Sequence, residues 1–435
     1  MNSWRMSLLI FCLGGLLCRY GYTANEAAPD EGDRIERFDK LPAPIGGKIK
    51  SDDYIYVVVK KGQEVKIPSY AIKEVVYADG DANYNEAIKQ RDDGRYTKAA
   101  QYFQKALESL TAQKWAPEYC NYGMGDAFYK FGKFTGYKGR SGTQYSPPSV
   151  YYRKALEANP KSRFMPDIVV KLPICLAEEG KLDEADAALK DAEERIKKYR
   201  DEAIKVGAGY GEIADHAAAQ IAVADARIAE RKAAAGKGNL SDVLDKWQSA
   251  RSKCVKFPDM YGEVVDGVLK VLVQDKKYTQ AISEAETIID NYAKDNDQKW
   301  LAILPSAYTA RGKANLALAV DHESKKQKLQ ANAAYADARW DFMYVIGQFF
   351  DNDEYLASAH FLAGVCYEKL KDIESDSHEK AVREWKLVIK NFPTYTNFVE
   401  ASKKELASVG EKLDDAPPTG AETTPAAAVP AKPKK

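Results

Sequence analysis

The chain has 435 residues, 45 % of them hydrophobic, which is enough apolar material for a repeat array or several domains and argues against disorder throughout. Lysine plus arginine equal aspartate plus glutamate at 64 each, so there is no overall field of the kind that gathers nucleic acid or an anionic membrane surface. This balance argues against a protein that binds nucleic acid. Alanine, lysine, glutamate and leucine are plentiful, which favours a mainly α-helical protein.

Residues 1–24 have the pattern of an export signal. Arg5 precedes a largely apolar stretch from Met6 to Leu17, and cleavage is expected near Ala24. The stretch is too short to span a bilayer, which needs about 20 residues. Cys18 directly after it leaves a lipid anchor as the alternative, although two leucines stand where such signals have small residues. We expect an exported protein of the periplasm or cell envelope, associated with membrane only through this signal or anchor.

The next segments are predicted to be a flexible acidic spacer at residues 25–32 and a small β module at residues 33–78. Runs of β-branched and aromatic residues, separated by turn signals, mark its strands. The predicted strands are Tyr54–Val59, Glu64–Ile67 and Ile72–Tyr77. A module of this size has a thin core.

From Asn83 the pattern becomes helical and recurs. In the first unit a glycine closes one helix, an aromatic residue starts the next, and small residues let the two helices approach while a large residue fills the groove. The residues of this unit are Ala87, Gly94, Tyr96, Ala99, Phe103, Ala106 and Leu107. They resemble the second half of a tetratricopeptide repeat (TPR), with Ala87 at the small position of its first helix. The end of the last unit, Phe392-Pro393 followed by Ala401 and Leu406, resembles the repeats of exported bacterial TPR proteins.

Later units carry the same pattern. The second comprises Gly125, Phe128, Gly132, Phe134, Tyr152, Ala155, Leu156 and Pro160; the third Leu172, Gly180, Ala185, Leu189 and Ala192; and the last Gly364, Tyr367, Ala381, Trp385, Val388 and Pro393. We therefore expect TPR-like repeats 1–3 at residues 83–205, a degenerate helical pair at 206–257, further TPR-like repeats at 258–410, and a disordered Pro/Ala-rich tail at 411–435.

The resemblance implies a mainly α fold: an α-solenoid of TPR-like helix pairs, here with a small N-terminal β module. It also implies a concave face, lined by the first helix of each pair, that takes a protein or peptide partner.

Residues that could carry chemistry do not converge, so we expect no enzyme, no catalytic residue, no cofactor and no metal site. The four histidines, His216, His322, His360 and His378, share no helical face at metal-ligand spacing. The Gly207–Gly211 stretch lacks the lysine of a phosphate loop, and Asp79, Asp81 and Asn83 lack the glycine and glutamate of a calcium loop. Widely spaced Cys120, Cys175, Cys254 and Cys366 are expected to be buried small hydrophobes, with disulfides as the alternative that export permits.

Tyrosines supply the candidate partner-binding residues. Tyr84, Tyr122 and Tyr129 fall on predicted first helices, while Tyr137, Arg140 and Tyr145 fall in an insertion at Gly136–Pro147. The alternative for each is packing between helices. The sequence thus predicts a non-enzymatic protein–protein interaction scaffold of the bacterial cell envelope, with an exported enzyme or glycan-binding protein carrying a helical accessory array as the alternative.

Overall fold

The computed structural model describes residues 32–38, 45–138, 142–207, 209–293, 303–350 and 352–411. The predicted signal at 1–24, nearly all of the spacer and tail, and Arg140 lie outside these residues. The chain divides into two compact units, one made of residues 1–52 with 56–80 and the other of residues 53–55 with 81–435.

The first unit is an antiparallel sheet of strand order β4-β3-β2-β1-β5. Its strands are β1 (Asp33–Arg37), β2 (Ile45–Asp52), β3 (Tyr56–Lys61), β4 (Gln63–Pro68) and β5 (Ile72–Val76). Gly62, at φ +78°, makes the tight turn between β3 and β4. One face of the sheet buries Ile35, Val57 and Val75. The sequence pattern had marked neither β1 nor β2 as a strand.

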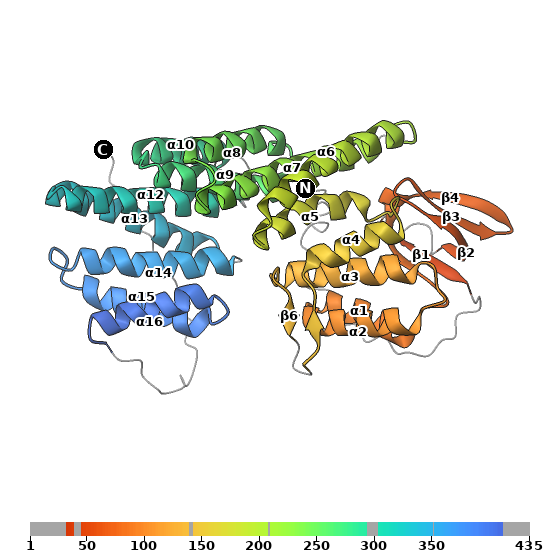
Figure 1. Cartoon of the computed structure of the whole chain (residues 1–435). Helices are drawn as coiled ribbons and strands as arrows, with labels where there is room; N and C mark the ends of the chain where they lie inside the picture. Colours follow the sequence, from red (N-terminus) through yellow and green to blue (C-terminus); the bar gives the residue numbers. More distant parts are fainter. Residues whose placement is uncertain are drawn as a thin grey trace, which may run out of the picture. The chain divides into compact units, whose positions relative to one another are not determined.

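The second unit consists of helices that pack in consecutive antiparallel pairs (Figure 1). The first helices of the pairs are α1 (Ala82–Asp92), α3 (Ala116–Lys130), α5 (Met165–Glu178), α7 (Gly209–Ala234), α9 (Pro258–Gln274), α12 (Leu304–Ser324) and α14 (Asp353–Lys369). The second helices are α2 (Tyr96–Ser109), α4 (Pro148–Ala158), α6 (Leu182–Ala203), α8 (Leu240–Cys254), α10 (Tyr278–Tyr292), α13 (Lys328–Gln348) and α15 (Ser377–Asn391), and α16 (Thr396–Ser408) follows the last pair. This arrangement confirms the predicted fold class.

The turn inside several pairs places one residue in the left-handed region. Gly94, Gly132 and Gly180 have φ values of +72°, +66° and +78° there, and Lys276 and Lys326 take the same place with φ values of +58° and +60°. The next residue in each turn donates its N–H to the carbonyl five residues earlier, over 2.8 to 3.1 Å. This bond satisfies a carbonyl at the end of the first helix and starts the second.

Helix spacing depends on contacts between a glycine and an aromatic ring. A Cβ added to Gly364 would lie 2.4 Å from Nε1 of Trp385, and one added to Gly312 would lie 2.6 Å from the ring of Phe342. The same holds for other pairs of facing residues, namely Gly125 with Tyr152, Gly123 with Phe103 and Gly267 with Trp247. The glycine therefore lets the backbone approach while the ring fills the groove.

Two short segments differ from their sequence-based descriptions. Tyr54 does not begin a strand: its ring packs edge-on against Tyr199 at 5.5 Å, its hydroxyl donates to Glu202 over 2.7 Å, and Tyr210 donates to the carbonyl of Ile55. The insertion at 136–147 contains two short paired strands, β6 (Tyr137–Lys138) and β7 (Gln144–Tyr145).

We predict that Gly364→Ala and Gly312→Ala each destabilise the protein by about 1–3 kcal/mol, since the new methyl group must displace a fully buried ring. Urea unfolding measures this. Gly262→Ala is the matched control, because no atom lies within 4 Å of its added Cβ, and it should be neutral or stabilise by about 0.5–1 kcal/mol. Equal effects of the three substitutions would contradict the spacing argument.

Candidate functional site

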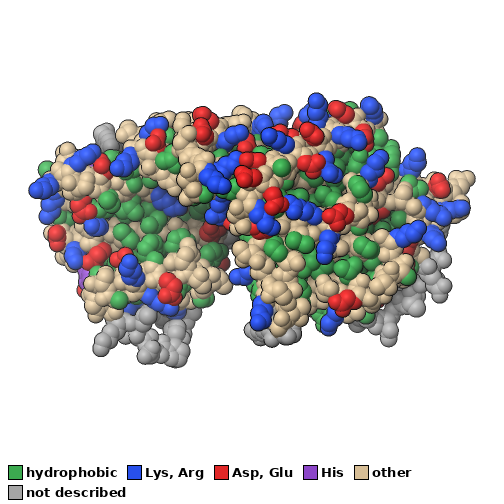
Figure 2. Space-filling view, in the orientation of Figure 1, with side chains coloured by type: hydrophobic (Ala, Val, Ile, Leu, Met, Phe, Trp, Pro, Cys, Tyr) green, Lys and Arg blue, Asp and Glu red, His purple; other side chains and the backbone are tan. Residues whose placement is uncertain are grey.

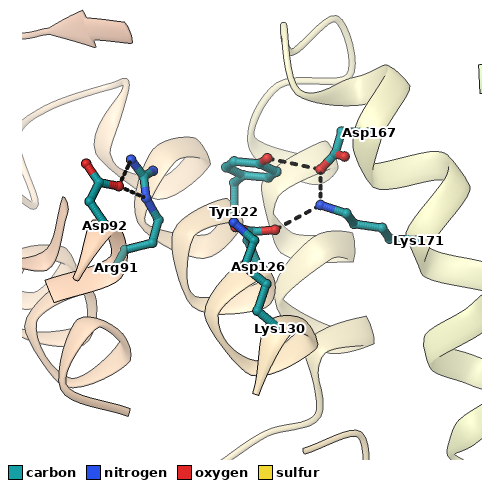
Figure 3. Close-up of polar contacts among 7 residues, drawn as sticks. All are labelled: Arg91, Asp92, Tyr122, Asp126, Lys130, Asp167 and Lys171. Carbon is teal, nitrogen blue, oxygen red and sulfur yellow. Dashed lines mark hydrogen bonds and ion pairs between the residues drawn. The ribbon is translucent and has the colours of Figure 1, made fainter. Parts of the chain in front are cut away.

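Polar and aromatic side chains gather where α3 faces α5. Tyr122, Asp126 and Lys130 repeat every four residues along α3, so they share one face of that helix. Asp167 and Lys171 do the same along α5. Figure 3 shows the two rows meeting, with the Lys171 side chain reaching between the two aspartates.

The cluster is held by short charged contacts. Nζ of Lys171 lies 2.8 Å from Oδ1 of Asp126 and 2.7 Å from Oδ2 of Asp167, and Lys130 Nζ lies 3.0 Å from the other oxygen of Asp126. Tyr122 donates its hydroxyl to Asp167 over 3.0 Å. Asp126 is only 4 % exposed. Its burial alone would raise its pKa, but Lys171 and Lys130 lower the pKa by more, so the carboxylate stays charged.

Aromatic rings border these charges. The ring of Tyr122 stacks on Phe164 with centroids 3.9 Å apart and planes 9° apart, which fixes its orientation. Tyr129, two turns further along α3, is half-buried, and Nζ of Lys171 lies 5.4 Å from its ring centroid. Phe134 packs edge-on against Tyr129 at 5.7 Å.

The same face continues over α7 and α9. Nε of Arg227 on α7 lies 2.5 Å from Oε1 of Glu263 on α9, and both side chains remain 38 % exposed. Burial lowers the pKa of Arg227, but Glu263 and the hydroxyl of Tyr129 raise it by more, so the net shift is upward. We call Tyr122, Asp126, Tyr129, Lys171, Arg227 and Glu263 the first-helix band, since each lies on the first helix of its pair.

The structure separates the tyrosines predicted from the sequence. Tyr122 and Tyr129 lie in the first-helix band. Tyr84 is 4 % exposed and packs edge-on against Trp115 at 4.9 Å, so we leave it out of the candidate surface. Tyr145 is 5 % exposed and half-buried Tyr137 stacks on it at 6.2 Å within the hairpin.

Lys171, Arg227 and Glu263 were missed at the sequence level. Each has an oppositely charged partner on a neighbouring first helix, at a distance of more than 30 positions in the chain. The available signal was the four-residue spacing of charges on predicted first helices, which could have been aligned from repeat to repeat.

The cysteines and histidines, which could in principle carry chemistry, make structural contacts. The four cysteines are free and buried, and burial raises the pKa of the Cys254 thiol to about 11. Histidines contact carboxylates of neighbouring helices, as in His216–Asp259 at 2.9 Å and His360–Glu384 at 2.6 Å. Within the described ranges no group of His, Cys, Asp and Glu side chains could hold a metal ion. None of the described helices is both long and apolar enough to cross a membrane.

Comparison with known proteins gives the following similarities. No family model matches the chain, and no curated protein matches it. Among solved structures, it is similar to the C-terminal part of a TPR repeat-containing protein from Cytophaga hutchinsonii, at 13 % identity and a TM-score of 0.36, covering 73 % of this chain and 98 % of that one.

Two further solved structures are similar. One is the TPR domain of P58(IPK), at 13 % identity and a TM-score of 0.19, covering 77 % of this chain and 100 % of that one. The other is the human IFIT1 dimer with PPP-AAAA, at 14 % identity and a TM-score of 0.30, covering 75 % and 68 %. The TPR-like architecture itself is shown by the helix pairs, turns and glycine–ring contacts of this chain.

We predict that Lys171→Ala destabilises the protein by about 3–5 kcal/mol, because it leaves the buried carboxylate of Asp126 without its closest cation. Chemical denaturation at neutral pH measures the change. Lys325→Ala is the control, since Lys325 is exposed and its partner Asp321 is only half-buried, so loss of this ion pair should cost less than about 1 kcal/mol. Similar losses for the two variants would show that the cluster is not buried in solution.

Proposed function

We propose that this TPR-like chain is a non-enzymatic scaffold that binds a protein segment along the first-helix band, in the cell envelope of a bacterium. The observation that carries the proposal is the band itself. It combines half-buried rings with charges whose positions are fixed by ion pairs between successive helices.

Such a band suits a protein ligand. Tyr129 offers apolar area with a polar tip, and Arg227 and Glu263 offer a donor and an acceptor at 38 % exposure. Because ion pairs already hold these side chains, little conformational entropy is lost when a partner binds them. A partner segment with both apolar and charged side chains would complement this surface.

The charge distribution supports a protein partner over a nucleic acid. On the face shown in Figure 2, lysine and arginine side chains lie interspersed with aspartate and glutamate. A nucleic-acid surface needs a continuous run of positive charge along the phosphates. The balanced total of 64 basic and 64 acidic residues agrees with this distribution.

The glycan-binding alternative finds less support in the aromatic residues. Rings that could stack on sugars are instead packed on one another, as in Tyr308 with Tyr344 at 4.4 Å and Trp340 with Tyr344 at 5.1 Å. The envelope location rests on the export pattern of residues 1–24.

Binding is tested by reversing one ion pair of the band. We predict that Arg227→Glu together with Glu263→Arg keeps the fold, since the pair is restored, but weakens partner binding at least tenfold because the partner meets inverted charges. Crosslinking mass spectrometry in intact cells identifies the partner, and calorimetry with that partner measures the affinity.

The matched control is the same exchange at a pair between α7 and α8, Asp225→Lys with Lys246→Glu, whose side chains lie 2.6 Å apart outside the band. It should bind like the wild type. If the Arg227/Glu263 exchange also binds like the wild type, the band is not the partner surface.

Export is tested separately by N-terminal sequencing of the protein from a periplasmic fraction. We predict a mature chain that begins near residue 25, because Ala24 is the best small residue at the cleavage position. Cys18→Ser should then leave the fractionation unchanged. Full-length protein in the cytoplasmic fraction would contradict export, and membrane association that depends on Cys18 would indicate the lipid anchor.

A further inference from the structure

Strands β2, β3 and β4 of the first unit form a face that points away from the core of that unit (Figure 1). Successive side chains of a strand point to opposite faces. Val57 and Val59 of β3 are buried, so Val58 and Lys60 point outward. Residues directly opposite each other in an antiparallel pair share a face, so the register also identifies the outward residues of β2 and β4.

Lysines dominate this outward face. Lys48 on β2 lies directly opposite Lys60 on β3, and Lys66 on β4 lies directly opposite Val58. Lys50 is exposed at a bulge of β2. The other three lysines are also exposed, and none of the four forms an ion pair within 4 Å with a residue that the structure describes. We call Lys48, Lys50, Lys60 and Lys66 the lysine face.

The register sets two like charges against each other on this face. Side chains directly opposite in an antiparallel pair have Cβ atoms about 4.5–5.5 Å apart, and like charges there are destabilising. Lys48 and Lys60 are such a pair. Glu64 on β4 lies opposite Lys60 on its other side, but these two side chains make no ion pair within 4 Å. An anionic partner would therefore supply counterions that the described part of the chain does not provide.

Two less polar side chains lie among the lysines. Tyr56 and Val58 are half-buried on the same side of β3, and Nζ of Lys66 lies 5.8 Å from the centroid of the Tyr56 ring. Tyrosine combines an apolar ring with a polar tip, and lysine can lay its aliphatic stem along apolar surface while its ammonium group reaches water. This combination is typical of protein surfaces at a membrane–water interface.

The lysine face differs from the first-helix band in how its charges are held. In the band, Lys171 and Arg227 are fixed by ion pairs of 2.5 to 2.8 Å, which suits a protein segment of fixed geometry. The four lysines have no such contacts with described residues, and each carries its charge on a flexible stem. Charges that can move suit a partner whose own charges move laterally, as anionic headgroups do in a fluid bilayer.

We propose that the lysine face is a peripheral membrane contact that binds the headgroups of anionic phospholipids, with Tyr56 and Val58 entering the interface between the lysines. This surface is separate from the first-helix band and gives the chain a second contact. The balanced total of 64 basic and 64 acidic residues does not cancel the local excess of charge. Charges beyond about 8 Å are largely screened at physiological ionic strength.

The test is cosedimentation of the whole protein with vesicles of phosphatidylcholine alone or with about one-third phosphatidylglycerol. Four lysines less Glu64 leave a net charge of three on the face, and each charge contributes roughly a factor of five near an anionic bilayer. We therefore expect about a hundredfold tighter binding to the anionic vesicles. High salt should abolish the difference. Binding through the apolar stretch near the N-terminus would appear on both kinds of vesicle, so their ratio reports the lysine face.

Substitutions then assign the effect to this face. Lys48→Gln with Lys66→Gln should weaken binding to anionic vesicles about 20-fold. Lys154→Gln with Lys197→Gln is the matched control, because these lysines of α4 and α6 are exposed, make no ion pair with a described residue and change the net charge equally. It should bind like the wild type. Glu64→Gln should strengthen binding about fivefold, and a folding defect cannot produce such a gain.

Equal binding to neutral and anionic vesicles, or equal losses in the two double variants, would overturn the membrane inference. Binding of a soluble polyglutamate peptide without binding to vesicles would also overturn it, and would assign the lysine face to an acidic protein segment. None of these results bears on the first-helix band, because the Arg227/Glu263 exchange tests that surface independently.

Discussion

The contact between a glycine on one helix and an aromatic ring on the next is the constraint on which the second unit depends. At Gly125, Gly312 and Gly364 even one methyl group would lie within 3 Å of the facing ring, so the backbones are as close as they can be. Each such contact fixes both the distance and the rotation of two helices. Because it recurs along the chain, the first helices keep the same face turned away from their partners. Side chains as distant in sequence as Tyr122 and Glu263 are thereby placed on one continuous surface.

The turns keep the repeat geometry even where the glycine of the sequence signature is absent. Lys276 and Lys326 adopt the left-handed conformation that Gly94 and Gly180 adopt in earlier pairs, and the hydrogen bonds around them are the same. A side chain in this conformation costs about 1–2 kcal/mol, which is small beside the burial of two helices against each other. The conformation of the turn is therefore imposed by the packing of the two helices, whichever residue occupies the turn. This is why the later units lack part of the repeat signature in their sequence although their helices pair like the others.

The fold class was predictable because it depends on a pattern that recurs, while single features depend on tertiary contacts. The predicted strand from Tyr54 to Val59 was right from Tyr56 onward. Tyr54 instead packs against Tyr199 and donates a hydrogen bond to Glu202, both more than 140 positions away in the chain. In the site, periodicity identified Tyr122 and Tyr129 as members of one helix face. It could not show that Trp115 covers Tyr84, nor that Lys171 reaches Asp126, because both depend on the relative rotation of neighbouring helices.

Asp126 shows how ion pairs between first helices make a buried charge part of the fold. Two lysines contact Asp126, so its charge is compensated in the free protein and removing either lysine costs stability. The same contacts join α3 to α5, so the buried charge also fixes how these two first helices face each other. That makes the carboxylate of Asp126 a structural element of the band.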